Sequence, residues 1–226
     1  MKTLSKAVAI ASLLSAGVMS ANVANAEVAF NASLVSDYVF RGASYTSNGA
    51  ALQGGADYSH DSGVYAGTWL SNIETADSEG EVQDDVEYDI YAGYWMEVGD
   101  FEIDLAYLTY NYADADDWNT TEISASITTA GVTASVYQDI DAANTTYLGL
   151  AYSTELPQEL SLDVAIGHTL DGKVDGEAVW GEDFTDMSAS VGKSFDVVDV
   201  ALTVTNVSYE FAEDDTLVFL TASTEF

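Results

Sequence analysis

Carboxylate side chains recur at every second position in two stretches of this chain, at Glu87 and Asp89 and again at Glu102 and Asp104. In an extended strand, residues i and i+2 point to the same face, so each pair would present two negative charges to one side of a sheet. Such a face attracts cations, and Arg41 could supply the counter-charge for part of it. These residues therefore indicate binding or passage of cations.

Arg41 shares a face with Asp37 if the segment Val28–Arg41 is one strand. The two residues would then lie roughly 13 Å apart, so any ion pair of Arg41 must be with a carboxylate on a neighbouring strand. Two interpretations stay open: Arg41 forms a constriction opposite an acidic wall, or it is a structural plug that neutralises buried carboxylates.

The two histidines are the other candidates for chemistry. His60 lies beside Asp61 in a turn, where it would cap a hairpin or form half of an acid–base pair. His168 continues an outward stripe and would need a serine on the same face, but Ser188 and Ser190 are expected to point inward. We therefore expect no catalytic residue and no enzyme, with a barrel lipid hydrolase as the less favoured alternative.

The elements that position these residues belong to a 226-residue chain with 38 Asp and Glu, 5 Lys and Arg, and a formal net charge of −33. Such acidity excludes nucleic acid as a partner. The chain has no Cys, which excludes thiol catalysis and Cys-ligated metal. Its 14 Tyr, 8 Phe and 4 Trp favour an ordered, β-rich chain over a disordered one.

The first 26 residues have the pattern of a secretory signal peptide. Lys2 and Lys6 precede an apolar stretch at 7–19, and the small-residue triplet at 24–26 resembles a cleavage site. We predict that residues 1–26 are removed and that residues 27–226 form one domain.

Alternation with a period of two predicts that this domain is built of strands. From Val86 to Val98 one face is apolar, whereas Glu87, Asp89 and Glu97 lie on the other. About twelve such segments occur, each of the roughly 9 to 13 residues that a tilted membrane strand needs. No uncharged apolar run after residue 26 reaches the length of a transmembrane helix.

The connections between these segments alternate in length. Short turns are expected at 61–63, 99–100, 130–131, 156–159 and 195–196, and longer polar loops at 42–48, 74–85, 113–117, 141–144, 171–183 and 210–214. This alternation predicts a single antiparallel transmembrane β-barrel of about 12 strands, with short periplasmic turns and longer extracellular loops, in the bacterial outer membrane. A secreted acidic β-sandwich is the alternative.

The carboxyl terminus and the aromatic residues agree with the barrel prediction. The last apolar stripe closes on Phe226, which resembles the membrane-assembly signal read by the barrel-assembly machinery. Two interfacial girdles are expected, one at Phe30, Tyr58, Phe101, Phe184 and Phe195 and the other at Phe40, Tyr107, Tyr147, Tyr209 and Phe211.

Three runs, Ser36–Gly42, Gln53–Tyr58 and Tyr65–Asn72, together with Tyr88, Asp89, Gly93 and Tyr94, make the chain resemble the TorF-type porins of proteobacteria. The resemblance is dense over the first third of the exported part and weaker beyond it. It implies an outer-membrane barrel that passes small solutes, and it leaves the solute open.

The lumen is where function is expected. With the apolar stripes outward, the pore-lining set is Asp37, Arg41, Gln53, Asp57, Glu87, Asp89, Tyr91, Trp95, Glu97, Glu102, Asp104, Asp139 and Asp163. Inward aromatics, which also include Tyr65, Trp69, Tyr110 and Tyr137, would either stack on a solute or fill the barrel. We therefore predict a channel for passive diffusion of small solutes that prefers cations. The alternative is a structural or adhesive barrel without an open pore.

The expected partners are outer-membrane lipid, lipopolysaccharide, and small solutes or cations. No cofactor and no metal site is predicted. The loops carry three acidic clusters, formed by Asp77, Glu79, Glu81, Asp84 and Asp85, by Asp114, Asp116 and Asp117, and by Asp171, Asp175 and Glu177. Plain solvated charge is the favoured interpretation of these clusters, and divalent ions that bridge them to lipopolysaccharide phosphates are the alternative.

Overall fold

The structure is a computed structural model, which describes residues 27–76, 82–141, 143–174, 177–178, 182–209 and 214–226. The predicted signal peptide, residues 1–26, lies outside the described residues. Among the residues that are described, no helix is long and apolar enough to cross a membrane.

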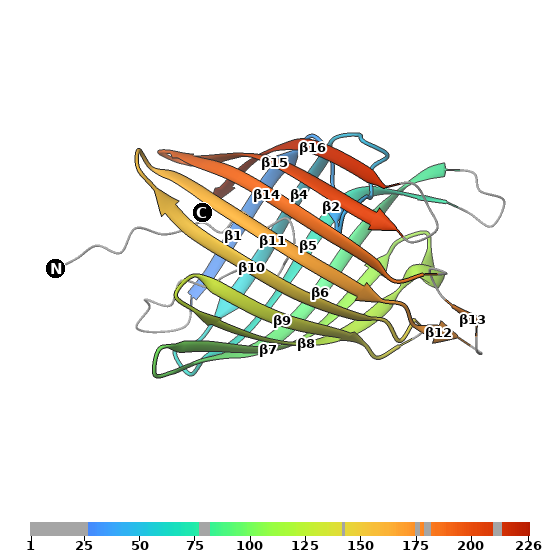
Figure 1. Cartoon of the computed structure of the whole chain (residues 1–226), viewed down its shortest axis with the longest axis horizontal. Helices are drawn as coiled ribbons and strands as arrows, with labels where there is room; N and C mark the ends of the chain where they lie inside the picture. The colour runs from blue at the N-terminus through green and yellow to red at the C-terminus, as the bar shows by residue number, and fades with distance from the viewer. Residues whose placement is uncertain (1–26, 77–81, 142, 175–176, 179–181, 210–213) are drawn as a thin grey trace.

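Twelve antiparallel strands close into a barrel, as predicted (Figure 1). The strands are β1 (Glu27–Val35), β4 (Ala51–Ser59), β5 (Val64–Ala76), β6 (Val82–Val98), β7 (Phe101–Tyr112), β8 (Thr120–Thr129), β9 (Val132–Asp139), β10 (Thr146–Leu156), β11 (Leu160–Leu170), β14 (Phe184–Phe195), β15 (Val198–Tyr209) and β16 (Asp215–Glu225). Each pairs with its neighbours in the chain, and β1 also pairs with β16. Closure therefore leaves the barrel without an edge strand.

Within the described ranges, four short strands and one 3₁₀ turn stand outside this sheet. They are β2 (Val39–Phe40), β3 (Ala43–Ser44), β12 (Lys173–Val174), β13 (Glu177–Ala178) and η1 (Asp116–Trp118). β2 pairs only with β3, and β12 only with β13.

The alternation in β6 shows why these residues form a barrel wall. Val86 and Ile90 are exposed on the outside, whereas Glu87 and Asp89 are buried inside. The other strands repeat this pattern, so a continuous belt of large apolar side chains surrounds the barrel. An apolar surface of that extent marks an interface with lipid or protein.

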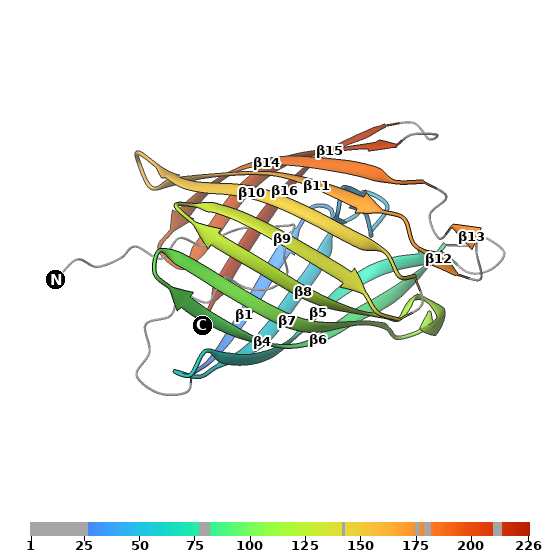
Figure 2. The same cartoon turned by 60° about the horizontal axis from the view of Figure 1, so that its bottom comes forward.

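The connections alternate in length around the barrel, as predicted. The short turns gather at one end, here called the turn end, and the long connections at the other, here called the loop end (Figure 2). At the turn end, Ala130 and Gly131 both have positive φ, of 49° and 80°. Two consecutive residues of this kind form the hairpin turn whose twist matches the flanking strands.

The prediction that the first strand runs to Arg41 is wrong. β1 ends at Val35 and β4 begins at Ala51. Residues 36–50 leave the wall and fold into the barrel, where the blue β2 lies within the outline of the sheet in Figure 1. We call this segment the plug. It leaves the wall because Tyr38 and Phe40 pack against lumen aromatics instead of facing outward.

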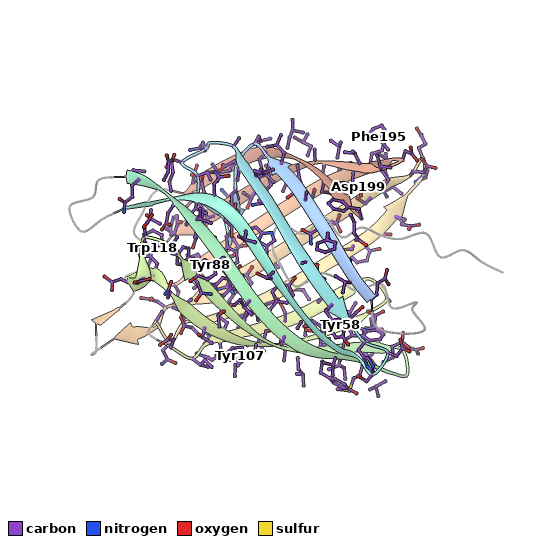
Figure 3. The ribbon with its side chains drawn as sticks, turned by 180° about the vertical axis from the view of Figure 1, so that it is seen from behind. Tyr58, Tyr88, Tyr107, Trp118, Phe195 and Asp199 are labelled. Atoms are coloured by element: carbon purple, nitrogen blue, oxygen red, sulfur yellow. The ribbon has the colours of Figure 1, made fainter. Side chains whose placement is uncertain are left out.

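The girdle prediction is wrong for three residues, Phe40, Tyr147 and Phe184, and its Phe211 lies outside the described residues. Phe40 belongs to the plug and packs against lumen aromatics. Phe184 pairs with Tyr209 at the loop end, and their ring centroids are 5.6 Å apart, so Phe184 does not share a rim with Phe195. Tyr147 is buried in the lumen. The outward Tyr58 and Phe195 lie at the turn end, and Trp118 lies at the loop end (Figure 3).

Candidate functional site

The plug is a hairpin whose tip is the dipeptide Arg41–Gly42 between β2 and β3. Arg41 has φ of 48° and Gly42 has φ of 84°. The tip is therefore another turn with two positive φ values, a conformation that favours Asn-Gly. A left-handed backbone costs a residue with a Cβ roughly 1–2 kcal/mol, so the contacts of the Arg41 side chain must offset that strain.

Gly42 is required at the tip by a close approach to the wall. A Cβ at this position would lie 2.8 Å from the Cβ of Val207 and 3.1 Å from the Cβ of Asp186. Val207 is on β15 and Asp186 on β14, so the tip reaches the wall formed by these two strands.

Hydrogen bonds at the base of the plug fix its shape. The Asp37 carboxylate accepts the Ser44 hydroxyl at 2.6 Å. The Thr46 hydroxyl accepts the Tyr38 amide at 3.0 Å and lies 2.6 Å from the Gly49 carbonyl. Asp37 and Thr46 are both buried, and these bonds tie the two ends of the hairpin together.

The guanidinium of Arg41 occupies a cage made of one carboxylate and three aromatic rings. Its Nη1 and Nη2 donate to the two carboxylate oxygens of Glu122 on β8, at 2.8 and 2.9 Å. Its Cζ lies 4.3 Å from the ring centroid of Tyr147, 4.7 Å from that of Phe40 and 5.4 Å from that of Tyr137. We call Glu122, Tyr137, Tyr147 and Phe40 the Arg41 cage. It combines a two-point carboxylate contact with cation–π contacts.

A second layer of hydrogen bonds holds the cage. The Tyr110 hydroxyl donates to Glu122 at 3.0 Å, and the Tyr147 hydroxyl donates to Asp186 at 3.3 Å. Burial alone would lower the pKa of the Arg41 guanidinium, but Glu122 and then Tyr110 more than offset this, so that pKa is raised above its ordinary value. Arg41 therefore stays cationic.

The plug also contacts walls on opposite sides of the barrel. Val39 packs with Leu217 and Phe219 of β16. On another wall, the ring of Phe40 lies 5.9 Å from that of Tyr110 on β7. The plug thus spans the lumen.

The predicted pore-lining carboxylates fall into distinct environments. Glu87 and Asp89 are buried, 2% and 4% exposed, and Glu87 Oε2 and Asp89 Oδ1 have no hydrogen-bond partner within the described part of the chain. Asp163 on β11 also has one buried oxygen without a partner there. Glu97 and Glu102 are paired across β6 and β7 and are exposed at the turn end. The predicted acids therefore face the lumen both deep inside the barrel and at its turn end.

The remaining predicted residues bond to neighbours on the wall. Gln53 lies 3.2 Å from the Ser33 hydroxyl, and Asp57 accepts Asn31 at 3.1 Å. Asp139 accepts the Thr120 hydroxyl at 2.6 Å. Trp95 packs against the aromatic cluster that the plug also contacts.

Tyrosine–carboxylate pairs recur through the lumen. The hydroxyl groups of five tyrosines donate to inward carboxylates in the pairs Tyr65–Asp104, Tyr91–Asp57, Tyr110–Glu122, Tyr112–Glu87 and Tyr147–Asp186. The rings of Tyr91 and Tyr65 cover Gly67 and Gly93. A side chain on either glycine would collide with the ring, so the tyrosines lie along the wall.

Glu122 and Asp186 are residues of this candidate site that the sequence did not single out, and Tyr147 was expected in an outward girdle instead of the lumen. β8 reads TTEISASITT, a stretch in which small polar residues on both faces weaken the alternation. The usable signal was that Glu122 lies on the face opposite Ile123 and Ile127, which are exposed outside.

Each histidine lies within hydrogen-bond distance of a hydroxyl side chain, His60 Nδ1 at 2.8 Å from Ser62 Oγ and His168 Nδ1 at 2.9 Å from Thr185 Oγ1. His60 Nδ1 accepts the Ser62 amide at 3.1 Å and so caps its turn, as expected. His168 bonds Thr185 at 2.9 Å on the outside, whereas Ser190 is buried and bonded to Thr203. Among the described residues, no group of three or more His, Asp or Glu is placed to hold a metal. The predicted loop cluster members Asp77, Glu79, Glu81 and Asp175 and the side chain of Glu177 lie outside the described part.

A closed antiparallel barrel with an apolar outer wall, an acidic lumen and an inserted hairpin has the architecture of outer-membrane β-barrel proteins. The chain belongs to the family described as "Bacterial protein of unknown function (Gcw_chp)", whose model matches residues 20–224. A comparison with curated proteins finds no match.

Solved structures share the fold at low sequence identity. A KdgM porin is 8% identical with a TM-score of 0.57, over 88% of this chain and 98% of that one. LpxR from Salmonella typhimurium is 8% identical with a TM-score of 0.55, over 88% and 99%. The translocator domain of autotransporter NalP from Neisseria meningitidis is 11% identical with a TM-score of 0.50, over 92% and 90%. At such identities the likeness shows the fold alone.

Proposed function

We propose that this protein is an outer-membrane channel for passive diffusion of small solutes, that it prefers cations, and that it is exported by removal of residues 1–26. One observation carries the proposal. The lumen holds hydrogen-bonded carboxylates at Asp37, Asp57 and Asp139, while the charge of Arg41 is neutralised by Glu122. A lumen whose fixed charges are mostly carboxylates favours cations over anions.

The apolar outer belt supports a membrane location, and the resemblance to TorF-type porins agrees with a channel. The KdgM porin has also been solved in complex with disordered oligogalacturonate, a chain of acidic sugars. An acidic oligomer would be repelled by the lumen of this protein. We therefore place its solutes among small neutral molecules and cations.

The experiment is single-channel recording of the refolded barrel in planar bilayers under a KCl gradient. We expect discrete current steps and a reversal potential whose sign shows that K⁺ permeates more readily than Cl⁻. Neutralising the lumen in an E87Q/D89N/E102Q variant should reduce the selectivity. D100N is the matched control, because Asp100 is an exposed acid in a turn outside the lumen. Anion selectivity, or equal effects of the two variants, would contradict the proposal.

A structural barrel without an open pore is the second candidate, because the plug contacts opposite walls. It predicts a correctly folded barrel that gives no current. Neither candidate needs a catalytic residue, and we propose that the protein is not an enzyme.

A further inference from the structure

The Arg41 cage has two parts that belong to different elements. Glu122, Tyr137 and Tyr147 stand on β8, β9 and β10 of the barrel wall, whereas Phe40 and the guanidinium belong to the plug. Glu122 is held by Tyr110 and Tyr147 by Asp186, both also on the wall. The wall part therefore keeps its arrangement independently of the plug.

We propose that this wall part is a binding site for small solutes that carry a guanidinium group, and that Arg41 occupies it as an internal ligand. A solute of this class competes with Arg41 and so releases the plug tip from the wall. The proposal rests on the proposed channel function in one respect, because it names a class of solute that would enter the pore. Binding at the cage can be measured whether or not the barrel conducts.

The contact geometry selects guanidinium over other cations. The two nitrogens of Arg41 reach the two oxygens of Glu122 at 2.8 and 2.9 Å, a parallel pair of bonds that only a planar fork can make. Tyr147 and Tyr137 add ring faces at 4.3 and 5.4 Å. A simple ammonium ion has the same charge but cannot make the two parallel hydrogen bonds to Glu122.

The backbone of the plug makes the internal ligand displaceable. Arg41 binds with φ of 48°, a strained conformation that a free solute does not adopt. The tether in turn gives Arg41 an effective concentration of order millimolar. Free ligand must therefore reach a similar concentration to compete in the native protein, and much less if Arg41 is removed.

The test uses Arg41→Asn, since Asn tolerates positive φ and leaves the wall part of the cage unoccupied. Methylguanidinium is the probe and methylammonium at equal ionic strength is the control. Calorimetric titration of the detergent-solubilised barrel should show methylguanidinium binding to R41N about tenfold more tightly than methylammonium, because one additional charged hydrogen bond is made. The R41N/E122Q variant should lose this difference. Equal binding of the two probes, no binding, or unchanged preference in R41N/E122Q would overturn the proposal.

A second variant guards against misfolding of R41N. R41K keeps the charge of the tip but not the fork, so methylguanidinium should displace the lysine and bind this variant too, and absence of binding there would count against the cage. Current recording separates this proposal from the channel. If R41N binds methylguanidinium but every form of the barrel is silent, the cage stands and the channel fails. If currents occur but methylguanidinium does not bind, the channel proposal stands and the cage proposal fails.

Discussion

At the scale of single residues, the plug depends on two neighbours with opposite requirements. Arg41 accepts an unfavourable φ because Glu122 and the surrounding rings hold its side chain. Gly42 needs no side-chain partner, but only a residue without a Cβ fits against Val207. The tip thus requires the side chain of Arg41 and the absence of a side chain at Gly42.

A substitution of Gly42 tests this requirement. Gly42→Ala adds a Cβ 2.8 Å from that of Val207 at φ of 84°, and we expect plug docking to weaken by about 1–3 kcal/mol. Single-channel recording should show larger or more frequent openings. Gly99→Ala is the matched control, because Gly99 has φ of 68° at the opposite end with nothing within 4 Å of the added atom. Identical behaviour of the two variants would argue that the tip does not limit current.

At the scale of elements, the sequence predicted the wall but not the plug. The outer surface requires apolar residues at every second position, so strand after strand could be located from alternation alone. Residues 36–41 alternate in the same way, yet Tyr38 and Phe40 are half-buried and pack against lumen aromatics. Local alternation cannot distinguish a strand facing lipid from a hairpin enclosed between walls.

The candidate site divides in the same manner. The alternation of side chains along β6 correctly predicted that Glu87 and Asp89 point inside, because this alternation can be read from the local sequence. The partners of Arg41 come from strands far along the chain, and their meeting depends on strand count and register, which no local pattern encodes. The ion pair was expected with an unspecified neighbouring strand, whereas the structure assigns it to Glu122.

Removing the plug should widen the channel. Val35 and Ala51 are paired in the β1–β4 ladder, so a short Asn-Gly turn can join them in place of residues 36–50. We expect the shortened barrel to fold and to conduct several-fold more current per channel. Circular dichroism checks folding. Unchanged conductance in a folded barrel would show that the constriction lies elsewhere.

The seam between the first and last strands makes its own prediction. Phe30 and Phe226 exchange two backbone hydrogen bonds of 2.8 Å, and their ring centroids lie 6.3 Å apart. Deletion of Phe226 should lower the amount of barrel in the cell envelope several-fold, measured as the heat-modifiable form on gels. Phe195→Ala, which removes an exposed aromatic at the same end but off the seam, should have little effect. Equal losses in the two variants would show that Phe226 has no special role in assembly and contributes only as an exposed apolar residue.

At the scale of the whole molecule, charge and hydropathy are distributed in separate places. The outer belt is apolar, while the acidic side chains of the described residues lie in the lumen and at the barrel ends. This division explains how a chain can be 48% hydrophobic and strongly acidic at once. If the protein is the cation-preferring channel proposed above, its selectivity would arise from the summed field of many carboxylates as well as from single contacts.

Salt concentration should reveal that field. The Debye length falls from about 10 Å at 0.1 M salt to about 3 Å at 1 M, so charges at the mouth stop influencing the pore at high salt. We expect cation selectivity to decline over this range while that of the E87Q/D89N/E102Q variant changes less. If the selectivity of the native barrel does not change with salt concentration, the selectivity comes from one desolvated site and not from the summed field.

The contact of Val39 with Leu217 and Phe219 also constrains the order of folding. Val39 lies near the start of the barrel, and its partners lie in the last strand, so the plug cannot complete its packing until that strand is in place. Contacts of such wide sequence separation form late and slowly. Docking of the plug is therefore expected to be among the last kinetic events, and an optical probe near residue 39 would report when the barrel has closed.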